Sequence, residues 1–133
     1  MQKIHFAAIA ALLLFAANIP THAAFKFEKD DTVCLIGNSL PDRMQHDGWF
    51  ETVLQSELKG LNVSFRNLGF SGDTVNNRPR NSGFPKPEDY LKICGADVIF
   101  AFFGYNESFS GEKGIEGFKK ELSAMIDNYS KLK

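Results

Sequence analysis

The segment that most constrains the fold is ADVIFAFF, residues 96–103. It is almost entirely apolar and does not alternate with polar residues, which is typical of a strand buried on both faces in the middle of a parallel sheet. From Thr32 onward, short β-branched or aromatic runs alternate with helical periods, which is the pattern of βαβ units. The sequence therefore predicts an α/β fold with a parallel sheet and flanking helices.

The same periodicities predict the individual elements. Strands are expected at residues 32–36, 62–67 and 96–103, and helices at residues 48–59, 88–93 and 115–132. Asp47 is the expected N-cap of the first helix and Gly60 its C-terminal stop. Residues 69–87 are rich in Gly, Asn, Pro and Ser and are predicted to form a loop. A loop of this length in a small domain is often functional.

The third strand and the last helix both require a neighbour. If the chain has only three strands and the first lies between the other two, the apolar strand at residues 96–103 becomes a sheet edge. Native domains normally cover such an edge, because it promotes aggregation. We therefore expect the chain to be truncated before the last strands of its domain, unless a second copy or another partner completes the sheet.

The N-terminus has the features of a cleavable signal peptide. Lys3 precedes the apolar run FAAIAALLLFAA, and small residues follow at Ala23 and Ala24. The run is about a dozen residues long, which is shorter than the roughly 20 that a transmembrane helix needs. We expect residues 1–23 to be removed, residues 24–133 to form one domain, and the protein to be secreted or periplasmic with no transmembrane segment.

The charge balance bears on possible binding partners, and the two cysteines bear on a possible disulfide. The chain has 15 Lys and Arg against 16 Asp and Glu, interspersed along its length. This balance does not indicate a nucleic-acid or anionic-membrane partner. An oxidising compartment would permit Cys34 and Cys94 to pair, but two buried free thiols are equally compatible with the sequence.

A short polar cluster follows each expected strand. The clusters are Gly37-Asn38-Ser39, then Asn67-Leu68-Gly69-Phe70-Ser71-Gly72-Asp73, then Gly104-Tyr105-Asn106-Glu107-Ser108. Because sites in open parallel sheets form beyond the carboxyl ends of the strands, we expect the three clusters to surround one crevice.

These clusters contain the groups that acyl transfer by a serine requires. Ser39 is the candidate nucleophile, and its own amide, the Gly72 amide and the Asn106 side-chain NH2 are candidate donors to the developing oxyanion. Taken alone, each residue is more commonly an ordinary turn, N-cap or loop residue.

Further residues are candidates for substrate contact. Asn38, Tyr105 and Glu107 adjoin the expected crevice, although Glu107 would equally serve to cap the turn that follows. Trp49, Phe70, Phe84 and Phe109 are candidates to line an acyl or sugar pocket, but helix-to-sheet packing explains Trp49 equally well.

The segments GNSL, GFSGDT and GYNE, in this order, resemble blocks one, two and three of the SGNH hydrolases, also called GDSL esterases and lipases. The resemblance implies a flavodoxin-like three-layer fold, with Ser39 as nucleophile and Gly72 and Asn106 as oxyanion donors. It also implies hydrolysis of a small-molecule, glycan or lipid ester without a metal or an organic cofactor.

The chain departs from the family pattern at two places. Asn38 stands where the family usually has Asp. The family's fourth block, Asp-x-x-His, supplies the base, and no histidine follows Asn106 in this chain. His46 is the only histidine outside the expected signal peptide and is the alternative base.

The sequence supports two hypotheses about function, one an enzyme and the other a binding protein. The first is an exported serine ester hydrolase of the SGNH type, which these residues represent in part. The second is a non-catalytic exported binding module, or pseudoenzyme, that has lost the catalytic Asp and His. A nucleotide-binding flavodoxin-like domain fits the fold less well, because the first strand is not followed by a glycine-rich phosphate loop.

Overall fold

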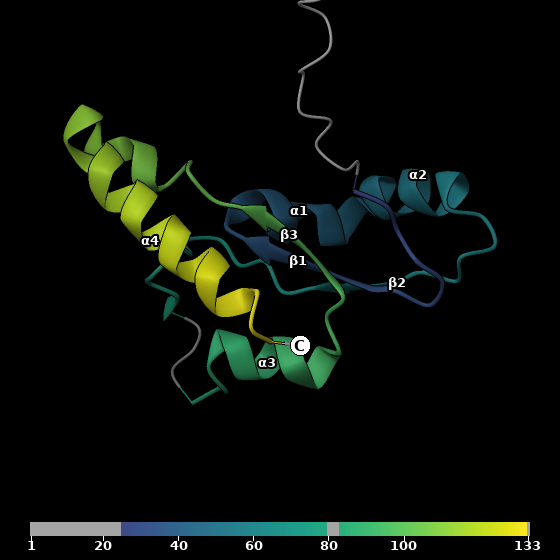
Figure 1. Cartoon of the computed structure of the whole chain (residues 1–133). Helices are drawn as coiled ribbons and strands as arrows, with labels where there is room; N and C mark the ends of the chain where they lie inside the picture. The colour runs from purple at the N-terminus through teal and green to yellow at the C-terminus, as the bar shows by residue number, and fades with distance from the viewer. Residues whose placement is uncertain (1–24, 80–82, 133) are drawn as a thin grey trace, which may run out of the picture.

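The structure is a computed structural model that describes residues 25–79 and 83–132. A three-stranded parallel sheet, in the order β2-β1-β3, lies between two layers of helices (Figure 1). The elements are, in chain order, β1 (Thr32–Gly37), α1 (Ser39–Asp47), α2 (Trp49–Glu57), β2 (Ser64–Asn67), α3 (Pro87–Cys94), β3 (Val98–Phe102), the short 3₁₀ helices η2 (Glu107–Ser110) and η3 (Glu112–Gly114), and α4 (Ile115–Tyr129).

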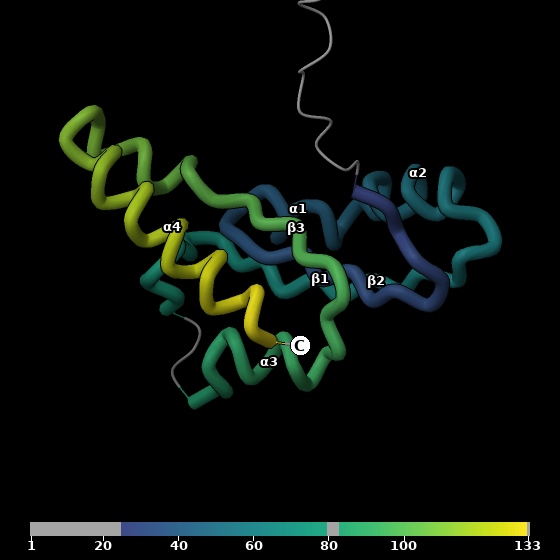
Figure 2. Tube along the Cα trace, in the orientation of Figure 1, coloured from purple at the N-terminus to yellow at the C-terminus, as the bar shows by residue number. Residues whose placement is uncertain are grey.

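The central strand β1 divides the core into two clusters. Val33 and Leu35 are fully buried on the face covered by α2, where they pack with Phe50 and Leu58. Cys34 and Ile36 face the opposite layer; there α3 contributes Leu91 and α4 contributes Met125. The alternating side chains of one strand thus hold both layers, as expected for an α/β fold. The Cα trace in Figure 2 shows α3 and the C-terminal end of α4 side by side in that second layer.

The helix predicted at residues 48–59 is present as α2, but its predicted Asp47 N-cap is wrong, because Asp47 is the last residue of a preceding helix, α1, that was not predicted. Gly48 adopts a left-handed conformation (φ 63°) that ends α1 and precedes α2. Its amide donates to the Met44 carbonyl over 3.0 Å, and α2 has no side-chain N-cap. Helix α1 was not predicted because its sequence, SLPDRMQHD, has no apolar stripe.

The prediction that the third strand is buried on both faces is also wrong. β1 is the central strand, and β3 pairs with β1 alone among the described residues. Its residues are half-buried apart from Ala101, which is exposed. β3 begins one residue after Asp97, where the Thr32 amide of β1 donates to the Asp97 carboxylate (2.8 Å). The remaining helix and strand ends coincide with the expected ends or differ from them by at most three residues.

No helix within residues 25–79 and 83–132 is long and apolar enough to cross a membrane. The expected signal peptide lies outside the described residues.

Candidate active site

Ser39 lies at a sharp junction between β1 and α1. Gly37 has φ 137°, and a Cβ built on it would lie 2.3 Å from the carbonyl oxygen of Phe102. Only glycine therefore allows the end of β1 to pass this close to β3. The Asn38 amide then donates to that same Phe102 carbonyl over 3.3 Å. The chain turns directly into α1, so Ser39 is its first residue and is half-exposed.

The N-terminus of α1 presents free amide donors beside Ser39. Asp42 makes the first helical hydrogen bond, from its amide to the Asn38 carbonyl (3.3 Å). The amides of Ser39 and Leu40 precede that bond, and Pro41 has no N–H. The positive end of the helix dipole lies at the same place. An oxyanion formed on a substrate at Ser39 would be stabilised here.

The loop that follows β2 brings Gly72 to the same end of the sheet. The Phe70 amide donates to the Gly37 carbonyl over 3.0 Å, which fastens this loop to the residue before the Asn38-Ser39 turn. Gly72 is exposed and has φ 95°, and a Cβ built on it would meet nothing within 4 Å. The space around Gly72 is therefore open to a substrate.

Asn106 joins the loop after β3 to the loop after β2. Its Nδ2 donates to the carbonyl of Asp73, the residue after Gly72, over 2.9 Å. A side-chain NH2 has two hydrogens, so one remains for a substrate oxygen. The sequence-predicted oxyanion donors Gly72 and Asn106 thus occupy loops that are bonded to each other, and the Gly72 loop is bonded in turn to the end of β1.

Glu107 strengthens this link between loops. Its two carboxylate oxygens accept hydrogen bonds from the backbone amides of Val75 and Gly104, each over 2.9 Å. Glu107 is half-buried, and both of its oxygens have backbone partners. Its place in the site is that of a positioning residue, which holds the Gly72 loop against the Asn106 loop.

Asp42 and Asn67 also position the site; Asn67 was expected at the end of the second strand, but no role was predicted for either residue. The Ser71 hydroxyl and amide both donate to Asp42 Oδ2, which joins α1 to the Gly72 loop. The hydrogen bond from the Ser71 hydroxyl holds the pKa of the Asp42 carboxyl below its ordinary value. Asn67 donates to the Pro41 carbonyl (2.7 Å) and accepts from the Gly69 amide (2.9 Å). These links were not predicted because helix α1 was not predicted. The available signal was Asp42, an acidic residue three positions after Ser39.

Asn38 and Tyr105, the other candidates for substrate contact, differ strongly in exposure. Asn38 is only 3 % exposed, and its Nδ2 has no hydrogen-bond partner among the described residues. Tyr105 is 66 % exposed and packs edge-on against Phe109, with ring centroids 5.4 Å apart. Tyr105 can meet a substrate at the rim of the site, whereas Asn38 lies beneath the surface.

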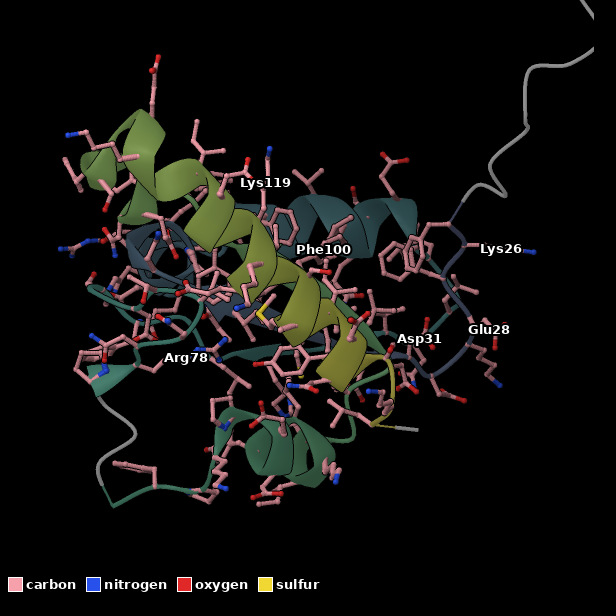
Figure 3. All side chains as sticks on the ribbon, turned by 60° about the vertical axis from the view of Figure 1, so that its left-hand side comes forward. Lys26, Glu28, Asp31, Arg78, Phe100 and Lys119 are labelled. Atoms are coloured by element: carbon pink, nitrogen blue, oxygen red, sulfur yellow. The ribbon has the colours of Figure 1, made fainter. Side chains whose placement is uncertain are left out.

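A cavity of about 210 Å³ adjoins the carboxyl ends of β1 and β2. It begins at Asp73, next to Gly72, and extends toward the N-terminal half of α3. Figure 3 shows Arg78, which also lines it, reaching from the loop after β2 toward α4. The other lining residues are Ile36, Asn67, Leu68, Phe84, Pro85, Pro87, Tyr90 and Leu91. Among the expected pocket aromatics, Phe84 lines this cavity, whereas Trp49 is 75 % exposed on α2.

His46 is not placed to accept the proton of Ser39. The two residues occupy the last and first turns of the same helix, seven residues apart. At 1.5 Å of rise per residue they are separated by about 10 Å along the helix axis. Within the described part of the chain, no cluster of three or more His, Cys, Asp or Glu side chains could hold a metal ion.

Comparisons with family models, with curated proteins and with solved structures found no match to this chain.

Proposed function

We propose that this protein is an exported serine ester hydrolase of the SGNH type, with a flavodoxin-like fold, and that it acts on a glycan, lipid or other small-molecule ester. The observation that carries the proposal is the set of bonds among the three loops. Phe70 is bonded to Gly37, Asn38 to Phe102, and Asn106 to Asp73. These bonds link the loops that carry a serine at a helix N-terminus and two candidate oxyanion donors, which supports the nucleophile and the oxyanion hole but not the base that acyl transfer also uses.

The chemistry assigns one step to each group. Ser39 Oγ forms a bond to the acyl carbon while its proton passes to solvent water. The bond from that carbon to the leaving oxygen breaks, so the alcohol departs and an acyl group remains on Ser39. The negative charge on the carbonyl oxygen is stabilised by the amides of Ser39 and Gly72 and by Asn106 Nδ2. Water then releases the acid and restores the serine. The cavity of about 210 Å³ is suited to an apolar part of the ester, since Phe84, Pro85 and Leu91 are among its lining residues.

In the described residues no histidine lies beside Ser39 to act as a base, and this restricts the esters that the chain can cleave alone. Loss of one member of a Ser-His-Asp triad lowers turnover by a factor on the order of 10⁴ to 10⁶. A leaving group that departs as a stable anion does not need a general acid. We therefore expect activated aryl esters to react and alkyl esters to react far more slowly.

The test is the release of p-nitrophenol from p-nitrophenyl acetate by the purified full chain. Ser39→Ala is compared with the wild type and with the matched control Ser56→Ala, which changes an exposed serine of α2. We expect release above background from the wild type and from Ser56→Ala, but not from Ser39→Ala. Equal rates for all three proteins would refute the proposal.

The second candidate function is a non-catalytic binding module. The position of His46 favours it, because in the described residues the only imidazole lies about 10 Å along α1 from Ser39. In that case Ser39→Ala would leave the p-nitrophenol rate unchanged and would alter only the affinity for an ester ligand.

A further inference from the structure

Two cysteines from different elements meet in the core beneath α3. Cys34 lies in β1 and is fully buried, and Cys94 is the last residue of α3 and is half-buried. Both pack in the cluster that contains Leu91 and Met125. Burial raises the pKa of the Cys34 thiol and the nearby Cys94 thiol adds to this, and neither thiol belongs to the candidate active site.

Backbone hydrogen bonds independently hold these two positions close to each other. The Asp97 amide donates to the Thr32 carbonyl (2.9 Å), and the Thr32 amide donates back to the Asp97 carboxylate (2.8 Å). Cys34 lies two residues after Thr32, and Cys94 lies three residues before Asp97. In addition, the Ala96 amide donates to the Leu91 carbonyl over 3.0 Å, which holds the turn that leaves α3. The separation of the two thiols is therefore restricted by the fold.

We propose that Cys34 and Cys94 are a modification site: in the folded protein they form a disulfide that joins the central strand to α3 when they meet an exchangeable small-molecule disulfide.

The reaction consists of two exchange steps. The thiolate of Cys94, the less buried residue, attacks one sulfur of the external disulfide and releases one thiol. The thiolate of Cys34 then attacks Cys94 Sγ and releases the second thiol. The products are the Cys34–Cys94 disulfide and two external thiols, so two electrons and two protons pass to the oxidant.

The surroundings of Cys34 make the second step slow. Burial raises the pKa of the Cys34 thiol to about 12, and Cys94 adds to the effect. Since the thiolate is the nucleophile, very little of Cys34 is reactive at neutral pH. A mixed disulfide on Cys94 should therefore accumulate before the intramolecular bond forms, and the second step should accelerate as pH rises.

The experiment uses the full chain, reduced with dithiothreitol, desalted and incubated with oxidised glutathione, with aliquots quenched in acid. Intact-mass spectrometry should show a single glutathione adduct that converts to a species two hydrogens lighter than the reduced protein. Non-reducing peptide mapping should join the Cys34 and Cys94 peptides. Cys34→Ala should stop at the adduct, and Cys94→Ala should form no adduct while the protein remains folded.

A folded wild type, verified by circular dichroism, in which the adduct persists or in which both thiols stay reduced would overturn the proposal. So would oxidation that occurs only in urea. As a readout that does not depend on the variants, the thermal midpoint of the oxidised wild type should exceed that of the reduced wild type by at least about 5 °C.

Discussion

Asn106 donates a hydrogen bond from its side-chain Nδ2 to the carbonyl oxygen of Asp73 over 2.9 Å. This bond spans the loops after β3 and β2 and leaves the second hydrogen of the NH2 group available. Gly72, whose amide is another candidate oxyanion donor, directly precedes Asp73 in the chain. A single side chain therefore serves both as a candidate oxyanion donor and as a support for the loop that carries another.

Replacement of Asn106 separates these two roles. Asn106→Ala should lower kcat/KM for p-nitrophenyl acetate by about 10²- to 10³-fold, the usual effect of losing one oxyanion donor. Its free energy of unfolding should fall by only about 1 kcal/mol. Gln55→Ala is the matched control, because Gln55 Nε2 donates to the Val63 carbonyl in the same way (2.7 Å) but lies on α2. The control should lose similar stability and no activity; equal activity losses would contradict the assignment.

Replacement of Glu107 should destabilise the two loops that it joins and should lower turnover only through that effect. Glu107→Ala leaves the amides of Val75 and Gly104 without their acceptors, and the free energy of unfolding should fall by about 2–4 kcal/mol. Turnover should fall as well, because the Gly72 and Asn106 loops lose their common support. Urea denaturation of Glu107→Ala beside Glu112→Ala, an exposed glutamate of η3, provides the measurement. If the free energy of unfolding of Glu107→Ala were as high as that of Glu112→Ala, Glu107 would have no positioning role.

Two glycines with positive φ should respond very differently to alanine. In Gly37→Ala the new methyl group would lie 2.3 Å from the Phe102 carbonyl oxygen, so we expect a loss of about 2–5 kcal/mol in unfolding free energy. In Gly48→Ala the methyl group meets nothing within 4 Å, and only backbone strain of about 1–2 kcal/mol remains. Thermal denaturation distinguishes the two; similar midpoints would mean that β1 and β3 are not so close at Gly37.

The link between Asp42 and Ser71 should make stability depend on pH. The Ser71 hydroxyl lowers the pKa of Asp42 in the folded state, so the bond stabilises the fold above the unfolded-state pKa and loses its effect as pH falls through the folded-state pKa. Ser71→Ala should therefore be less stable than the wild type at neutral pH, and the difference should shrink below about pH 4. Carboxyl-carbon NMR should also show a higher pKa for Asp42 in Ser71→Ala. An unchanged Asp42 titration would contradict the link.

The sequence could predict which residues lie near one another where parallel strands alone determine their position. Parallel strands end at one edge of the sheet, so Ser39, Gly72 and Asn106 were expected around one crevice, and the structure joins their loops by hydrogen bonds. The sequence left the central position of β1 as one alternative, since TVCLIG is shorter and less apolar than the segment around β3. The sheet order places TVCLIG between two neighbours and so buries it.

Other contacts could not be predicted because they depend on tertiary geometry. Glu107 was expected to contact substrate or to cap a turn; its actual partners, Val75 and Gly104, come from two different loops. Asp42 was overlooked because α1 has no apolar stripe to reveal it as a helix. The proximity of Cys34 and Cys94 depends on where α3 ends above β1, and sequence spacing carries no information on that distance.

The most direct test of Ser39 as the nucleophile is intact-mass spectrometry of the protein mixed with excess p-nitrophenyl acetate. Acylation expels p-nitrophenolate without a general acid, whereas deacylation requires activation of water by a base that the described residues do not place at Ser39. The acetyl group should therefore accumulate. We expect one acetyl group per molecule, mapped to Ser39 and absent from Ser39→Ala. Acetylation confined to lysines, or equal in both proteins, would contradict the account.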